Sequence, residues 1–215
     1  TLPRMLAVLL VVAAVAALVN WWSILTDNQR VETISKPIAT IAIGGVAVAA
    51  ADRGGVDEGV LVAALIAYLC CLAGDVALLR VVDKFVVGLA SFLVGHIAFV
   101  VMFALLGLDE WWLGVVAAVI AAVVAAVVGR RVVAGAKGQD PALTIPVCAY
   151  LVVILTMAIV GWATGRPAAL AGSALFVASY SVLGWRKFVE AKQWMGVTIM
   201  ITYHLALVGI ALSLL

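Results

Sequence analysis

A single carboxyl group, Asp75, lies inside an apolar segment that is long enough to cross a membrane. The segment runs from Leu61 to Leu79 and contains no other charged residue. An ionisable side chain at membrane depth costs a few kcal/mol and is usually retained for function. Because a carboxyl group can give or accept a proton, its candidate chemistry is general acid–base catalysis. The alternative is a structural carboxyl group that reaches the membrane interface near Arg80.

Several other apolar segments carry polar groups at about the depth of Asp75. At about 1.5 Å of helical rise per residue, Asp75 lies roughly 7 Å inside the end of its segment that Arg80 marks. A similar depth in the other segments is reached at Asn20, Thr40, Ser91, Thr144, Ser179, Tyr180 and Thr198. Since buried polar groups need partners, this predicts a polar cavity open toward the cytoplasmic leaflet. The alternative is interhelical hydrogen bonding, which Ser and Thr commonly provide in membranes.

Two histidines, His96 and His204, lie deeper in their segments. They could be ligands, proton carriers or satisfied core residues. Two histidines and a carboxylate could in principle hold a metal ion, but both histidines sit roughly 10 Å deeper than Asp75 by helical rise. We therefore predict no metal site. The tyrosines in the middle of segments each need one hydrogen-bond partner and are structural by default: Tyr68, Tyr150 and Tyr203.

The composition excludes a soluble domain. Of the 215 residues, 67% are hydrophobic and 11% are charged, and the mean hydropathy is +1.28, whereas globular proteins are roughly half apolar. The net charge of +2 and the absence of a basic stripe argue against nucleic-acid binding. The three cysteines lie in apolar segments at spacings that suit neither a disulfide framework nor a metal site, so we interpret them as small core residues.

Eight apolar segments have, or nearly have, the roughly 17–25 residues of a spanning helix. They are Met5–Trp22, Pro37–Ala51, Gly59–Leu79, Phe85–Leu108, Trp111–Val128, Ala142–Ala163, Pro167–Trp185 and Trp194–Leu215. The second is the shortest. The connections are short, so no soluble domain is inserted. This predicts an all-α polytopic bundle of about eight transmembrane helices that forms a single transmembrane domain over residues 1–215.

The positive residues predict the orientation of the chain. Lys and Arg collect in cytoplasmic loops, and only Arg4, Arg53 and Arg166 lie on one side. The other side holds Arg30, Lys36, Arg80, Lys84, Arg130, Arg131, Lys137, Arg186, Lys187 and Lys192. We therefore expect a multi-pass protein of the plasma (inner) membrane with these loops in the cytoplasm and both termini outside.

Prolines mark expected helix starts. Pro37, Pro141 and Pro167 are each expected to open a helix, where the missing N–H costs nothing. Pro146 lies about one turn further inside and is expected to bend its helix.

The two halves of the chain, 1–108 and 109–215, share a set of features at a nearly constant offset. Four spans in each half would give a parallel repeat. The residue-by-residue match is weak, so duplication remains one interpretation. The matching pairs are Lys36-Pro37 with Asp140-Pro141, Asp75 with Tyr180, Lys84-Phe85 with Lys187-Phe188, and His96 with His204.

Short motifs spread over most of the chain carry a family resemblance. They are Lys36-Pro37, Ala73–Leu78, Phe92–Phe99, Pro146–Tyr150, Gly172–Ser179 and Thr202-Tyr203. Their order and spacing resemble those of the YhhN-like membrane proteins. Each motif alone is short and apolar, and the series of spacings carries the specificity.

The resemblance implies an eight-span protein and a function. Characterised members are lysoplasmalogenases, which hydrolyse the vinyl-ether bond of a lysoplasmalogen to a fatty aldehyde and a glycerophospho-base without a metal or organic cofactor. The family pattern has acidic residues on the third and seventh helices. Asp75 matches the first, while Tyr180, directly after Ser179, occupies the position of the second. A glutamine usual in the last helix corresponds to Leu207.

The acid that the resemblance assigns, Asp75, suits the chemistry of vinyl-ether hydrolysis. Protonation of a carbon gives an oxocarbenium-like ion, which water then attacks. The acid must stay protonated near neutral pH, and burial favours the neutral form of a carboxyl group. A second group must stabilise the cation or activate the water. Since a phenol is neutral near pH 7, Tyr180 would hydrogen-bond Asp75 or a water, and we predict Asp75 and Tyr180 as the catalytic residues.

The expected ligand is a lysophospholipid or another single-chain lipid, in contact with membrane lipids. Lys36 and Lys84 could hold its phosphate as point charges, or they could only set the topology. The candidate substrate-binding residues are Lys36, Thr40, Ser91, Tyr150, Ser179 and Tyr203.

The change at Tyr180 leaves a second function class open. A protein with half of the acidic pair could bind or handle lipids without catalysis. A small transporter is a third hypothesis, since a lone carboxyl group could carry a proton. However, the sequence shows no paired broken helices and no charged pathway.

Overall fold

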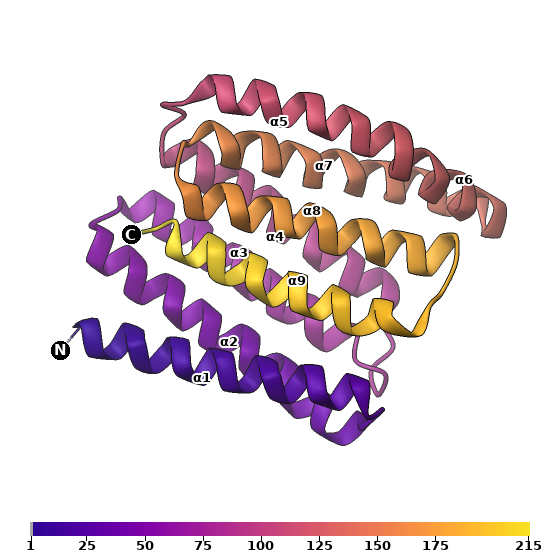
Figure 1. Ribbon diagram of the computed structural model, residues 1–215, viewed down its shortest axis with the longest axis horizontal. Helices are drawn as coiled ribbons and strands as arrows, with labels where there is room; N and C mark the ends of the chain where they lie inside the picture. The colour runs from indigo at the N-terminus through magenta and orange to yellow at the C-terminus, as the bar shows by residue number, and fades with distance from the viewer. Residues whose placement is uncertain (1) are drawn as a thin grey trace.

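The computed structural model describes residues 2–215 as a bundle of long helices (Figure 1). Within that range no strand occurs, and eight helices are long and apolar enough to cross a membrane. In lipid, every backbone polar group needs an internal partner, so a continuous apolar segment forms a helix. The predicted fold class is confirmed.

The helices follow the predicted order. Their bounds are α1 Leu2–Leu25, α2 Gln29–Gly54, α3 Glu58–Ala77, α4 Phe85–Leu105, α5 Trp111–Val124, α6 Arg130–Gln139, α7 Thr144–Ala163, α8 Pro167–Phe188 and α9 Gln193–Leu212. A π-helical turn, Ala125–Gly129, joins α5 to α6, so that the fifth span is continuous over Trp111–Gln139. A short 3-10 turn, Pro141–Leu143, precedes α7.

Six helices form a circuit around the centre of the bundle. Along it, α2 packs against α3, α3 against α4, α4 against α7, α7 against α8, α8 against α9, and α9 against α2. Outside this circuit, α1 lies on α2 and α9, and α5 lies on α7. Figure 1 shows both termini at one end and the α1–α2, α3–α4 and α8–α9 connections at the other. We call the end that holds these three connections the connection end.

The second helix is longer than the sequence predicted. It begins at Gln29, where the Asn28 side chain accepts a hydrogen bond from the Val31 N–H (3.2 Å) and so caps the first turn. The expectation that Pro37 opens a helix is therefore wrong, because Pro37 lies inside α2. As a result, Lys36 lies within a packed helix and not in a loop.

The other prolines lie near helix starts. Pro141 begins the 3-10 turn and Pro167 begins α8, as predicted. Pro146 is the third residue of α7, and so lies within its first turn, where a missing N–H removes no intrahelical hydrogen bond.

The backbones of α8 and α9 touch at two glycines, Gly172 and Gly209. A Cβ atom on Gly172 would lie 2.8 Å from the Ile210 nitrogen and 2.9 Å from the Ala206 oxygen. Small residues allow this kind of close approach in membranes, where van der Waals packing drives helix association. The contact fixes the position of α9, which supplies one wall of the site described below.

We expect Gly172→Ala to destabilise the protein by about 1–3 kcal/mol, because the new methyl group meets backbone atoms that cannot rotate away. Thermal unfolding in detergent measures the effect. Gly138→Ala is the matched control, since a Cβ atom there has no neighbour within 4 Å. Equal stability of the two variants would contradict the close contact.

Candidate functional site

The Asp75 carboxylate lies in the interior and is held by three groups. Lys36 Nζ lies 3.2 Å from Asp75 Oδ1. The Thr40 hydroxyl donates to Oδ2 over 2.6 Å, and the Tyr203 hydroxyl donates to the same oxygen over 2.8 Å. Asp75 is only 1% exposed. The alternative of a carboxylate that reaches the interface near Arg80 is therefore wrong.

Three helices bring these groups together. Lys36 and Thr40 are four residues apart on α2, and this spacing places both on one helix face. Asp75 comes from the last turn of α3, and Tyr203 comes from the middle of α9. Lys36 is itself buried, although it was expected in a cytoplasmic loop. The arrangement is a buried ion pair with two further hydrogen bonds on its anion.

A polar pocket of about 480 Å³ leads from the connection end to this carboxylate. Its inner wall includes Lys36, Asp75, Ser179, Tyr180 and Tyr203. The outer wall carries the charged residues Asp27, Glu32, Arg80 and Arg186. A polar cavity is thus present at the predicted depth.

Of the two arginines in the outer wall, one forms ion pairs and the other does not. Arg80 contacts Asp27 (2.6 Å) and Glu32 (3.3 Å), and the hydrogen bond to Asp27 raises the pKa of the Arg80 guanidinium. Arg186 forms no ion pair with any residue in the range 2–215. It is therefore the cation of this pocket whose charge is available to a ligand.

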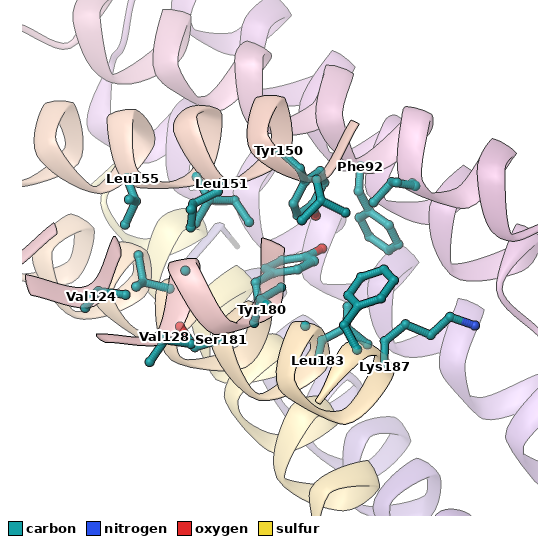
Figure 2. A pocket seen from close by; sticks show the side chains of 18 of the residues that line it. Phe92, Val124, Val128, Tyr150, Leu151, Leu155, Tyr180, Ser181, Leu183 and Lys187 are labelled. Atoms are coloured by element: carbon teal, nitrogen blue, oxygen red, sulfur yellow. The ribbon is translucent and has the colours of Figure 1, made fainter. Parts of the chain in front are cut away.

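An apolar pocket adjoins the polar one (Figure 2). Its volume is about 120 Å³, and its walls come from α4, α7, α8 and the continuous α5–α6 span. The two pockets share four wall residues, namely Leu78, Phe92, Tyr180 and Leu183. Figure 2 shows Tyr150, Tyr180 and Phe92 near one another, and Leu151, Leu155 and Val124 further along the pocket.

Aromatic rings fill the centre of the bundle beside the shared wall. Tyr180 stacks on Phe176, with ring centroids 5.7 Å apart, and meets His96 edge-on at 5.0 Å. Phe92 packs edge-on against both Tyr180 and Tyr203. Tyr203, and not Tyr180, donates the hydrogen bond to Asp75. Tyr180 instead lines both pockets.

The structure gathers most, but not all, of the predicted site residues. Lys36, Thr40 and Tyr203 contact Asp75, and Tyr150 lines the apolar pocket. Ser179 lines the polar pocket while its hydroxyl donates to the Ile199 carbonyl. Ser91 lines neither pocket. Where these side chains lie does not by itself establish their predicted roles in catalysis or substrate binding.

The remaining polar groups serve contacts between or within helices. Asn20 donates to Ser35, and Thr198 bonds within its own helix. His204 accepts from Trp21 Nε1 over 3.0 Å. Among residues 2–215, no three His, Cys, Asp or Glu side chains lie together as a metal-binding group.

Sequence reasoning missed the outer wall of the polar pocket. Glu32 was assigned to a connection, because α2 was predicted to begin at Pro37. Arg186 was counted only as a topology signal. No local pattern marks it as a pocket residue, since its place depends on how α8 lies against α9.

Removing one charge of the buried pair should destabilise the fold. Lys36→Met leaves the Asp75 carboxylate buried without its counter-charge, at an expected cost of about 3–5 kcal/mol. The double variant Lys36→Met/Asp75→Asn should recover most of this loss, because the amide oxygen still accepts from Thr40 and Tyr203. Unfolding of both variants in the same detergent tests the coupling, and simple additivity would contradict it.

Comparison with known proteins identifies a family for the chain. No curated protein and no solved structure matches the chain. The model of the YhhN family matches residues 31–214, which include all of the groups that hold Asp75. Because this match covers nearly the whole sequence, the chain belongs to the YhhN family.

Proposed function

We propose that this membrane protein is a lysoplasmalogenase-like hydrolase that cleaves the vinyl-ether bond of a single-chain phospholipid. One observation supports this above all others. The buried Asp75 carboxylate lies in the wall of a polar pocket that shares part of its wall with an apolar one. Family membership agrees with the proposal but does not by itself specify the reaction.

The two pockets match the two parts of a lysophospholipid. The phosphate would lie against Arg186, the unpaired cation of the outer wall. The cationic end of a zwitterionic head group would meet Asp27 and Glu32. The start of the hydrocarbon chain would enter the apolar pocket past Phe92 and Tyr180. The vinyl-ether bond joins these two parts, so it would lie near Asp75.

The reaction begins with a proton on the carboxyl group. Lys36 Nζ lies 3.2 Å from Asp75 Oδ1, so a proton can pass from the ammonium group to the carboxylate. Asp75 would then deliver it to the outer alkene carbon, which leaves an oxocarbenium ion on the ether and a carboxylate on Asp75. The carboxylate stabilises that cation in a site where the low dielectric strengthens the attraction.

Water completes the reaction. It adds to the oxocarbenium carbon and gives a proton to Asp75, from which Lys36 can be reprotonated. The hemiacetal then breaks its bond to the glycerol oxygen: the hemiacetal hydroxyl gives up its proton, the glycerol oxygen takes up a proton, and a fatty aldehyde remains. Lys36 thus stores the proton between turnovers. Tyr180 would orient the water or the ether oxygen as a neutral hydrogen-bond donor.

The topology that we propose places the pocket mouth in the cytoplasm. Most Lys and Arg residues lie at the connection end, and positive residues favour the cytoplasmic side. A lipid would then enter from the inner leaflet of the plasma (inner) membrane.

Tyr180 also supports a second candidate, a lipid-binding protein without turnover. The residue at the position of the second family acid is a phenol, and it packs among aromatic rings. Such a protein would bind the same lipid in the same two pockets.

Asp75→Asn should lower the rate of aldehyde release at least 100-fold, because the amide cannot transfer the proton. The assay uses purified protein in detergent and a lysoplasmalogen substrate. Asp83→Asn is the control, since it makes the same change in an exposed loop. Turnover that survives in Asp75→Asn would overturn the mechanism. Turnover seen only after Tyr180→Asp would favour the second candidate.

Arg186→Gln should weaken binding of a lysophospholipid about three- to tenfold, because one exposed charge contact to the phosphate is lost. Binding of a monoacylglycerol, which has no phosphate, should not change. Arg131→Gln is the matched control, because Arg131 lies at the same end but packs over Trp185. An equal loss for both lipids would contradict a phosphate contact.

A further inference from the structure

Two buried polar atoms near the shared wall of the pockets have no hydrogen-bond partner among residues 2–215. They are the Tyr150 hydroxyl and Nε2 of His96. Tyr150 is 8% exposed and His96 is fully buried. An unsatisfied buried polar group is costly in a protein interior, and more so where lipid replaces water. Two such atoms side by side therefore require an explanation.

The two side chains form one cluster with Tyr180. Ring centroids are 5.7 Å apart for His96 and Tyr150, 5.0 Å for His96 and Tyr180, and 5.1 Å for Tyr150 and Tyr180. Figure 2 shows the hydroxyl groups of Tyr150 and Tyr180 turned toward each other. Both tyrosines line the apolar pocket, whereas His96 lines neither pocket and packs against the two tyrosines in the interior. The cluster thus places polar groups at one point of a pocket wall that is otherwise largely hydrocarbon.

The chemistry of this spot suits an uncharged group. Nδ1 of His96 hydrogen-bonds to the Phe92 carbonyl, so Nδ1 carries the proton and Nε2 is left as an acceptor. A phenol can donate and accept. No Lys, Arg, Asp or Glu takes part in the cluster. A ligand group that both donates and accepts would satisfy it, and a hydroxyl is the simplest such group.

We propose that Tyr150 and Tyr180, packed against the buried His96, form a hydroxyl-binding subsite that recognises the free glycerol hydroxyl of a single-chain lipid. This inference rests on the proposed occupation of both pockets by one lipid. Tyr180 lines both pockets, so the subsite lies between the head-group end and the chain end. The glycerol backbone is the part of the lipid that lies between these ends. A lipid with a second acyl chain has no free hydroxyl to offer.

The test separates binding from turnover by using saturated ethers, which have no vinyl-ether bond to hydrolyse. The probes are 1-O-hexadecyl-glycero-3-phosphocholine and its 2-deoxy analogue, 1-O-hexadecyl-propanediol-3-phosphocholine. Their affinities for the full chain in nanodiscs are compared by displacement of a fluorescent single-chain lipid. The wild type should prefer the hydroxyl-bearing lipid about fivefold, the effect of roughly one net hydrogen bond.

Tyr150→Phe should bind both probes with equal affinity, because the phenol that contacts the hydroxyl is gone. Tyr68→Phe is the matched control and should keep the preference, since the Tyr68 hydroxyl is occupied by the Leu207 carbonyl at 2.7 Å. A preference that survives in Tyr150→Phe, or equal affinities in the wild type, would overturn the subsite and leave lipid binding intact. Failure of the wild type to bind either probe would overturn the proposed lipid occupancy and the subsite with it.

Discussion

The site depends on one buried ion pair, Lys36 with Asp75. Each charge would be costly alone at membrane depth, and the pair is held by hydrogen bonds from Thr40 and Tyr203 as well. A buried ion pair is a weak source of stability compared with apolar packing, because both ions lose their hydration. Its presence in a chain that is otherwise 67% hydrophobic therefore suggests a chemical use. The pair joins α2 to α3, and the Tyr203 hydrogen bond brings α9 to the same level.

The two pockets join at residues from the end of α3, from α4 and from α8, namely Leu78, Phe92, Tyr180 and Leu183. The polar pocket follows the α1, α2, α8 and α9 walls to Asp75, while the apolar pocket continues between α4, α7 and α8. Phe92 and Tyr180 stand between them and are fixed by the aromatic cluster around Phe176 and His96. A polar pocket beside an apolar one suits a ligand with the same division. The proposed lipid function rests on this match, and not on the number of spans.

The proton chemistry differs from a simple pair of acids. Tyr180 cannot supply a carboxylate, and the groups that contact Asp75 are a lysine, a threonine and a tyrosine. In the proposed reaction, the second exchangeable proton is stored on the Lys36 ammonium group, 3.2 Å from the carboxylate. The Tyr180 phenol would then contact neutral oxygens on the ligand. The proposed hydroxyl subsite uses the neutral tyrosine hydroxyls, while the charged Lys36 and Asp75 serve the proton transfer.

The sequence by itself determined the helical class and the number of spans, and it marked Asp75 as a carboxyl group within a span. These follow from local properties, since an apolar segment of spanning length must be helical in lipid and a lone carboxyl group within it is costly. It misjudged Pro37, because a neighbouring cap at Asn28 and the packing of α2 outweighed the local preference of proline. Only the tertiary structure decided that Lys36 faces Asp75, that Arg186 lines the pocket and that Ser91 does not. Those facts depend on the rotation of each helix about its axis, and a helix that is apolar on nearly every side carries little pattern from which to read that rotation.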